Sequence, residues 1–228
     1  MEQLAAEAAA QWGMITAAQA LRTNLTRKTL ARATTAHRLE HTDTRAVYRF
    51  AGTPQDATLD HLRSNWLALH PEAFLYERHK QLRTTDSFDD AVVSHLSAAH
   101  HIHGLGNRQP DTVDFTVPDS RRSRDHTLRF HVAASKPRWH IVDGLPVTTV
   151  AQTIADLYAD DLDRGHLGEI LYDALLRRRD SLHTIAEALD HVTGGCGRDT
   201  AIALLDSIHA PAEIITAADL FDTLTARR

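Results

Sequence analysis

The chain has 228 residues, of which 43% are hydrophobic and 24% charged, and its formal net charge is −5. This composition is typical of globular proteins and excludes wholesale disorder. No apolar run approaches the roughly 18 residues that a membrane-spanning helix requires. The opening stretch MEQLAAEAAAQWG has no basic residue ahead of its alanines, which argues against a secretory signal. The one cysteine, Cys196, cannot form an internal disulfide, so we expect a cytoplasmic protein.

Charge is unevenly distributed along the chain. Residues 1–52 contain seven arginines and lysines and four acidic residues, whereas residues 143–226 contain five arginines and fifteen acidic residues. This asymmetry predicts an N-terminal part that binds nucleic acid and a C-terminal part that contacts something else. The alternative is a pair of ordinary solvated surfaces.

The N-terminal part is predicted to contain a helix-turn-helix. An alanine-rich helix ends at Gly13, and Thr16 then has the position of an N-cap for the short helix AAQAL. The polar turn RTN follows, and Thr26 is predicted to cap a helix that runs to about Ala36. Two short helices joined by about three or four residues have the spacing of a helix-turn-helix.

The second of these helices is predicted to have an apolar face and a cationic face. Leu30, Ala33 and His37 share the apolar face by the three- and four-residue rule. Small and cationic side chains on the other face suit a helix in the major groove of DNA, where cations reach phosphates and guanine edges. A solvated helix surface is the alternative. The outward residues are Lys28, Ala31, Arg32 and Thr35, with Arg27 beside them in the first turn.

A hairpin is expected after these helices, with strands in HRL (37–39) and AVYRF (46–50). A helix-turn-helix followed by a hairpin is a winged helix, and Arg45 and Arg49 would lie on or near the wing. Duplex DNA is favoured over RNA, because there is no aromatic platform on which bases could stack. The predicted DNA-binding residues are Thr26, Arg27, Lys28, Arg32, Thr35, Arg45 and Arg49.

The stretch TPQDAT is a plausible linker, so we expect a winged helix-turn-helix domain over residues 1–53 and a second domain over 54–228. Helices are predicted in LDHLRSNWLALH and in FDDAVVSHLSAAHHIHGL, the latter with Val92, Leu96 and Ala99 as its buried stripe. Strands are predicted in DTVDFTVP and HTLRFHVA, with DSRRSRD as a basic hairpin loop between them.

Another strand pair is predicted around Gly144, before a helix that Thr149 caps. Three more helices follow, in DRGHLGEILYDALLRRR, SLHTIAEALDHV and GRDTAIALLDSI. The fold class is therefore α+β: a winged helix-turn-helix domain, then a mixed α/β domain that ends in several helices.

The sequence offers no convincing catalytic or metal site. His95, His100, His101 and His103 have no cysteine or carboxylate at metal-ligand spacing, so we expect no metal and no cofactor. Ser94 and His95 are neighbours on a predicted helix and would point apart, and no GxSxG elbow is present. The glycine-rich VTGGCGRDT lacks the Lys-Ser/Thr of a phosphate-binding loop, and no Glu-x-Lys of a restriction-type nuclease occurs.

Three arginines on the predicted basic loop are a possible second contact. They are Arg121, Arg122 and Arg124. They would extend a DNA footprint or contact a partner such as a protein or tRNA, or they would only improve solubility.

Several of these motifs resemble the AbiEi-type antitoxins of type IV toxin–antitoxin, or abortive-infection, systems. In the N-terminal domain, called the head below, these motifs are GMITAAQAL and RAVYRFAG. In the second domain they are AVVSHLSAAHHIHGL, VDFTVPDSRR and VDGLPVTTVAQTIADL, and the last of these is the most specific. Together they cover most of residues 13–157. The family usually has glycine where this chain has Ala46, and beyond Leu157 only a helical tail is recognised.

The resemblance implies an antitoxin that represses its own operon. Its winged-helix head would bind operator DNA, with Arg27, Lys28 and Arg32 in the recognition-helix region and Arg45 and Arg49 in the wing region. Its C-terminal domain would counteract a nucleotidyltransferase-type toxin, without necessarily forming a stable complex. The family has no catalytic residues to carry over.

Two other functions remain open. One is a stand-alone winged-helix regulator whose C-terminal domain senses a ligand or dimerises. An enzyme with an unrecognised site in the second domain is the other alternative, although the spacing of acids and bases shows no such site.

Overall fold

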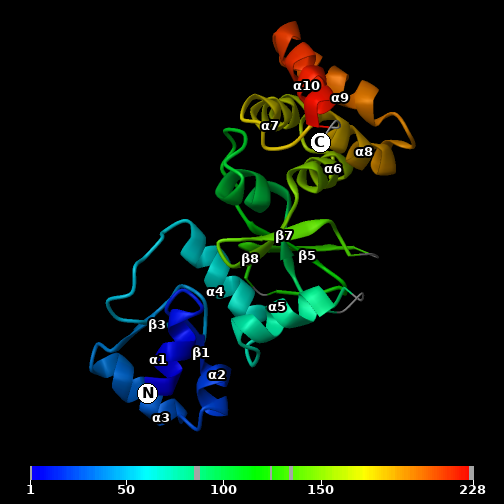
Figure 1. The fold of residues 1–228 in the computed structure, drawn as a ribbon. Coiled ribbons are helices and arrows are strands. Elements are labelled where there is room, and N and C mark those ends of the chain that lie inside the picture. Colours follow the sequence, from blue (N-terminus) through cyan, green and yellow to red (C-terminus); the bar gives the residue numbers. More distant parts are fainter. Residues whose placement is uncertain (1, 85–87, 124, 134–135, 226–228) are drawn as a thin grey trace. The chain divides into compact units, whose positions relative to one another are not determined.

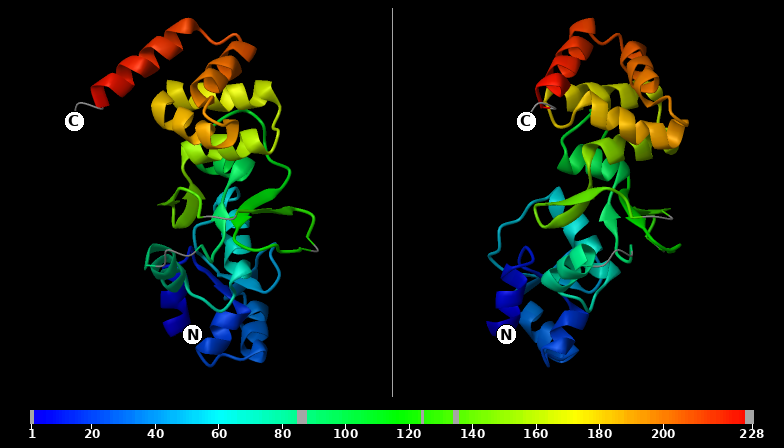
Figure 2. Two further views of the ribbon diagram at one scale, coloured as in Figure 1. Left: turned by 90° about the vertical axis from the view of Figure 1, so that its right-hand side faces the viewer. Right: turned by 45° about the vertical axis from the view of Figure 1, so that its right-hand side comes forward.

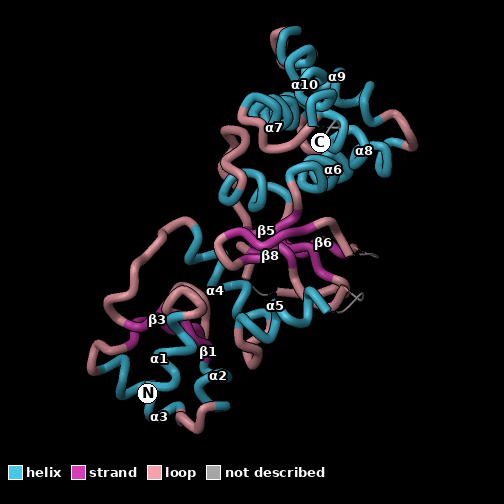
Figure 3. Tube along the Cα trace, viewed as in Figure 1, coloured by secondary structure: helices cyan, strands magenta, loops and turns pink. Residues whose placement is uncertain are grey.

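The computed structural model describes residues 2–84, 88–123, 125–133 and 136–225 (Figure 1). Helices and strands are both abundant, so the expected α+β class is confirmed (Figure 3). The chain forms two compact units, one comprising Met1–Ala91 with Asp143–Leu145 and the other Val92–Val142 with Pro146–Arg228. The first unit thus continues well beyond residue 53, where the sequence places the end of the head.

Three helices and a small antiparallel sheet begin the first unit. The helices are α1 (Glu2–Ala9), α2 (Ala17–Arg22) and α3 (Arg27–Thr35), and the strands are β1 (Met14–Thr16), β2 (Leu39–His41) and β3 (Val47–Phe50). The sheet order is β1-β3-β2. The predicted helices and hairpin are confirmed, whereas β1 is additional. The core of this part is formed by Leu4, Ala8, Ile15, Ala20, Leu30, Ala33 and Leu39.

The hairpin turn between β2 and β3 contains a residue in the left-handed region. Ala46 has a φ of 62°, and its carbonyl accepts a hydrogen bond from the Ala17 amide. Glycine adopts this backbone conformation at lower cost than alanine. Ala46 stands where the resemblance leads us to expect glycine, so the turn keeps a glycine-like shape without the glycine.

Two further helices, α4 (Leu59–Leu69) and α5 (Leu75–Thr84), complete the first unit. The first was predicted; the second, which buries Leu75, Arg78 and Leu82, was not. Arg78 is 1% exposed and donates Nε to Asp90 Oδ2 at 2.8 Å, Nη2 to Asp90 Oδ1 at 2.5 Å and Nη1 to the Trp66 carbonyl at 2.5 Å. Its guanidinium also lies 3.2 Å from the centre of the Trp66 ring. This buried cation therefore holds α4, α5 and the segment before Val92 together.

A five-stranded mixed sheet lies in the middle of the chain. Its strands are β4 (Val92–Val93), β5 (Val113–Val117), β6 (Leu128–Val132), β7 (Trp139–Val142) and β8 (Leu145–Thr148), in the order β6-β5-β4-β8-β7. The pairs β5–β6 and β4–β8 are parallel, and β4–β5 is antiparallel. The predicted strand pair around Gly144 is confirmed.

Two expectations for this region were wrong. The segment that contains Val92, Leu96 and Ala99 is not one helix: it starts with the buried strand β4, and a π-helix, η1 (Ser97–Ile102), follows. His95 has a φ of 52° and interrupts the chain between them. A short buried strand is fully apolar, so its sequence reads like part of a buried helix.

The other error concerns the connection between β5 and β6. The sequence predicted a hairpin, but Val113 pairs with Leu128 and Val117 with Val132, so the strands are parallel. Alternation of apolar residues shows which face a side chain occupies and carries no information about strand direction. All five residues of β5 are buried, so both of its faces are covered.

Five helices follow the sheet: α6 (Val150–Ala159), α7 (Arg164–Leu176), α8 (Leu182–Thr193), α9 (Gly197–Ser207) and α10 (Ala212–Thr225) (Figure 2). The first four were predicted, including the Thr149 cap, whose side chain accepts from the Gln152 amide at 3.2 Å. Buried aliphatic side chains join these helices, among them Ile154, Leu171, Leu189 and Leu205. No helix in the described ranges is long and apolar enough to cross a membrane.

The buried pair of Arg78 and Asp90 generates a test of stability. Replacing Asp90 with alanine leaves the Arg78 charge buried without its carboxylate, so the free energy of unfolding should fall by about 3–5 kcal/mol. The control is Arg198→Ala, which removes an ion pair of 3.0 Å whose partners are nearly half exposed and should cost less than about 1 kcal/mol. Urea denaturation of both variants measures the difference. Equal losses would contradict the proposed role of Arg78.

Candidate nucleic-acid interface

Two threonine caps define the start of α2 and α3. Thr16 forms a capping box with Gln19: its hydroxyl accepts from the Gln19 amide, and the Gln19 side chain accepts from the Thr16 amide, both at 3.0 Å. Thr26 accepts from the Thr29 amide at 3.2 Å. Because each cap satisfies an amide that the first helical turn leaves free, the boundaries of the two helices follow from local sequence.

Helix α3 divides into a buried and an exposed face. Leu30 and Ala33 are each 1% exposed, whereas Arg27, Lys28, Ala31, Arg32 and Thr35 all face solvent. His37 was expected on the buried face and is exposed instead, because the helix ends at Thr35 and His37 has a φ of 52°. Across the part of the chain that the structure describes, no acidic side chain forms an ion pair with Arg27, Lys28 or Arg32. The cationic charge of this face is therefore not neutralised within the described chain.

The start of α3 and the hairpin turn meet at one groove. Arg27 and Arg45 both line this groove, which has a volume of about 330 Å³. Arg45 is exposed and, within the described ranges, has no ion-pair partner. The structure thus brings the cation of the hairpin turn close to the cationic start of α3. The remaining lining of the groove is mostly apolar: Thr16, Ala17, Ala18, Leu21, Ala46, Val47, Ala68 and Pro71.

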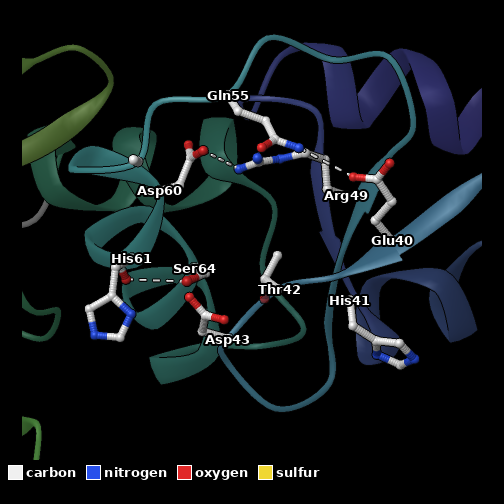
Figure 4. Close-up of a pocket in the computed structure, with 10 residues that line it drawn as sticks. Glu40, His41, Thr42, Asp43, Arg49, Gln55, Asp60, His61 and Ser64 are labelled. Atoms are coloured by element: carbon white, nitrogen blue, oxygen red, sulfur yellow. Dashed lines mark hydrogen bonds and ion pairs between the residues drawn. The ribbon is translucent and has the colours of Figure 1, made fainter.

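Arg49, in contrast, does not belong to this surface. The sequence places it with the cations of the hairpin, but it is 6% exposed and its Nη2 lies 2.5 Å from Asp60 Oδ2 (Figure 4). Thr44 of the hairpin turn also hydrogen-bonds Ser64 at 2.7 Å. These two contacts fasten the hairpin to α4, so Arg49 positions the hairpin and is not available to a ligand.

The pocket that Arg49 lines is acidic. It has a volume of about 280 Å³, and the carboxylates of Glu40, Asp43 and Asp60 outnumber its single arginine (Figure 4). Gln55 donates to Glu40 at 3.3 Å on the same rim. A phosphate would meet net negative charge there, so this pocket is not part of the nucleic-acid surface.

The arginines of the second unit occupy a different setting from the one expected. Arg121 is half-buried and Arg122 exposed on the connection between the parallel strands β5 and β6, and Arg124 lies outside the described residues. They are consequently not at the tip of a hairpin.

One histidine, His95, forms side-chain contacts that the sequence did not predict. His95 Nδ1 lies 2.9 Å from Ser94 Oγ, although the sequence predicted that these side chains would diverge. The His95 ring also stacks on His131, with 3.4 Å between ring centres. Burial, with His131 and Arg129 nearby, lowers the pKa of His95 to about 3. Because His131 lies on β6, far from His95 in the sequence, spacing along the sequence could not have found this pair.

Comparisons with known proteins show a similarity to a solved structure. No known family model matches the chain, and no curated protein matches it. The crystal structure of the RV2827C protein from Mycobacterium tuberculosis is similar, with 14% sequence identity and a TM-score of 0.49. The match covers 96% of this chain and 80% of that one.

The two hairpin arginines can be told apart by their effects on stability. Arg49→Ala should lower the free energy of unfolding by about 2 kcal/mol, because the largely buried Asp60 carboxylate loses its ion pair with Arg49. Arg45→Ala removes an exposed side chain and should change it by less than about 0.5 kcal/mol. Chemical denaturation of the two variants checks this. Equal losses of stability in the two variants would contradict the structural role of Arg49.

Proposed function

We propose that the N-terminal part of the first unit is a winged helix-turn-helix that binds duplex DNA. In this proposal α3 enters the major groove and the β2–β3 hairpin is the wing. The observation that carries it is the exposed cationic face of α3, which has no acidic partner among the described residues and begins beside the Arg45 turn. Exposed arginines and lysines on one such surface are suited to phosphates and guanine edges.

The packing of α3 supports this assignment. Its inner face is anchored by Leu30 and Ala33, so the helix presents Lys28, Ala31, Arg32 and Thr35 to solvent as one rigid stripe. Ala31 and Thr35 are small and would permit close approach to base edges. The Thr35 hydroxyl donates to the Ala31 carbonyl at 3.1 Å, and its oxygen can still accept. The N-terminal turn of α3 adds backbone amides for a phosphate.

Within the same proposal, the chain is a non-enzymatic antitoxin of the AbiEi type. Its head would repress its own operon, and its C-terminal part would counteract a nucleotidyltransferase-type toxin. The support is the resemblance of the motifs over residues 13–157, the most specific of which covers β8 and the Thr149-capped start of α6. The acidic balance of residues 143–226 fits a partner other than DNA.

Removing two cations from α3 tests the DNA-binding proposal. The double variant Lys28→Ala/Arg32→Ala should bind a duplex carrying the operon's own promoter roughly 1–3 kcal/mol more weakly, if one of them contacts a base edge. Fluorescence anisotropy near physiological salt measures this loss. The matched control is Lys80→Ala/Arg83→Ala, which removes the same charge from exposed positions on α5. The control should bind like the unchanged protein.

Measuring the DNA affinity at several salt concentrations tests the same proposal independently. Phosphate contacts release counterions, so the affinity should fall steeply as salt rises. The slope should become shallower in the α3 double variant and stay the same in the α5 control. A flat salt dependence, or equal losses in both double variants, would overturn the assignment of α3 to the groove.

The antitoxin role is tested separately, in cells that express the neighbouring nucleotidyltransferase-type gene. The full chain and its Lys28→Ala/Arg32→Ala variant should both restore growth, because neutralisation is assigned to the second unit. Only the unchanged chain should repress a reporter fused to the operon promoter. If the neighbour is toxic and neither protein restores growth, a stand-alone regulator becomes the better account.

A further inference from the structure

A cluster of metal-ligating side chains lies within the second unit. His95 follows β4, Asp114 lies on β5, His131 lies on β6, and Asp160 follows the end of α6. The neighbouring strands β5 and β6 are seen in Figure 3. One nitrogen each from His95 and His131 and one oxygen from Asp160 all lie within 4.8 Å of one another.

Each histidine uses one nitrogen for a hydrogen bond and keeps the other available. His131 Nε2 lies 3.0 Å from Asp114 Oδ1, so it carries the proton and donates to the carboxylate. That leaves Nδ1 with its lone pair, 4.0 Å from Asp160 Oδ2. His95 Nδ1 is engaged by Ser94 Oγ, which leaves Nε2. A carboxylate behind a histidine is the arrangement that orients histidine ligands in metal sites.

We propose that His95, His131 and Asp160 bind a divalent transition-metal ion of the zinc type, with Asp114 as the residue that orients His131. Two imidazole nitrogens and one carboxylate oxygen are a ligand set that Zn²⁺ accepts, whereas Mg²⁺ and Ca²⁺ prefer oxygen ligands alone. The proposal stands apart from DNA binding, because none of the four residues belongs to the first unit.

A further carboxylate strengthens the case for a cation. Asp156 stands one helical turn before Asp160, and its Oδ2 is buried with no hydrogen-bond partner among the described residues. Its other oxygen accepts from Gln152 at 2.8 Å. A buried carboxylate oxygen without a partner is costly, and a nearby cation would offset that cost. Asp156 therefore adds negative charge on the same side of α6.

Binding requires a small rearrangement of the rings. The imidazoles of His95 and His131 are stacked with 13° between their planes, so their lone pairs do not meet at one point. Ligand atoms around a tetrahedral zinc ion lie about 3.4 Å apart, which is shorter than the present 4.0 Å between His131 Nδ1 and Asp160 Oδ2. Rotation of one ring out of the stack brings the nitrogens together. An ion held this way would link β6, the end of α6 and the segment after β4.

Arg129 competes with the metal ion for the Asp160 carboxylate. Its Nη2 lies 2.8 Å from Asp160 Oδ2, and more than half of its side chain is exposed. A metal ion must displace this guanidinium or use the other carboxylate oxygen. Removing Arg129 should therefore strengthen metal binding, whereas removing a ligand should weaken it. If the cluster had only a structural role, these two kinds of variant would not change the metal affinity in opposite directions.

The test is a titration of the full chain with Zn²⁺, after treatment with a chelator, in competition with a chromophoric zinc indicator. One ion should bind per chain. His131→Gln and Asp160→Asn should each weaken binding more than tenfold, Asp114→Asn should weaken it about 10–100-fold, and Arg129→Gln should tighten it. The control is His183→Ala, which removes a largely exposed histidine paired with Glu187 and should leave the affinity unchanged.

Thermal unfolding monitored by circular dichroism, with and without Zn²⁺, shows whether each variant is folded. Zinc should raise the melting temperature of the unchanged chain and of His183→Ala, and not that of Asp160→Asn, which alters only a partly exposed side chain. Equal zinc affinity in the unchanged chain, His131→Gln and Asp160→Asn would overturn the site. So would weaker binding in Arg129→Gln, or an affinity that falls as much in His183→Ala as in the ligand variants.

Discussion

The first unit depends on one buried cation. Arg78 has almost no exposure, so its charge is tolerable only with a full set of partners, which Asp90 and the Trp66 carbonyl supply. Trp66 in turn donates Nε1 to the Ala91 carbonyl at 2.9 Å, immediately before the first strand of the large sheet. The partners of Arg78 thus hold two helices and the segment that leads to β4 together, and all of them lie within the first unit.

The same requirement separates cations that build the structure from cations available to a ligand. Arg49 and Arg45 are four residues apart on one hairpin. Arg49 is buried in an ion pair with Asp60, whereas Arg45 is exposed and lines the same groove as Arg27. Buried charges must be paired, so they hold elements together. Exposed charges without acidic partners among the described residues keep their electrostatic field available to a ligand, and the cations of α3 and the hairpin turn are among them. The proposal of DNA binding rests on that distinction rather than on the number of arginines.

The second unit combines an acidic helical part with a polar cluster inside its α+β region. His95, Asp114, His131 and Asp160 come from four separate segments, and their hydrogen bonds leave one imidazole nitrogen of each histidine available. Three of these side chains, His95, Asp114 and His131, are largely buried, so each needs polar partners. The metal-binding proposal concerns residues outside the head, so it can be confirmed or contradicted independently of the DNA-binding proposal.

The sequence by itself determined the features that depend on neighbouring residues. Thr16, Thr26 and Thr149 cap the predicted helices, and the apolar spacing of Leu30 and Ala33 identified the inner face of α3. Tertiary structure alone decided what depends on distant partners: the burial of Arg49 against Asp60, the parallel pairing of β5 with β6, and the meeting of His95 with His131. Caps and faces are set within one or two helical turns, whereas strand direction and the pairing of buried charges are set by residues that only folding brings together.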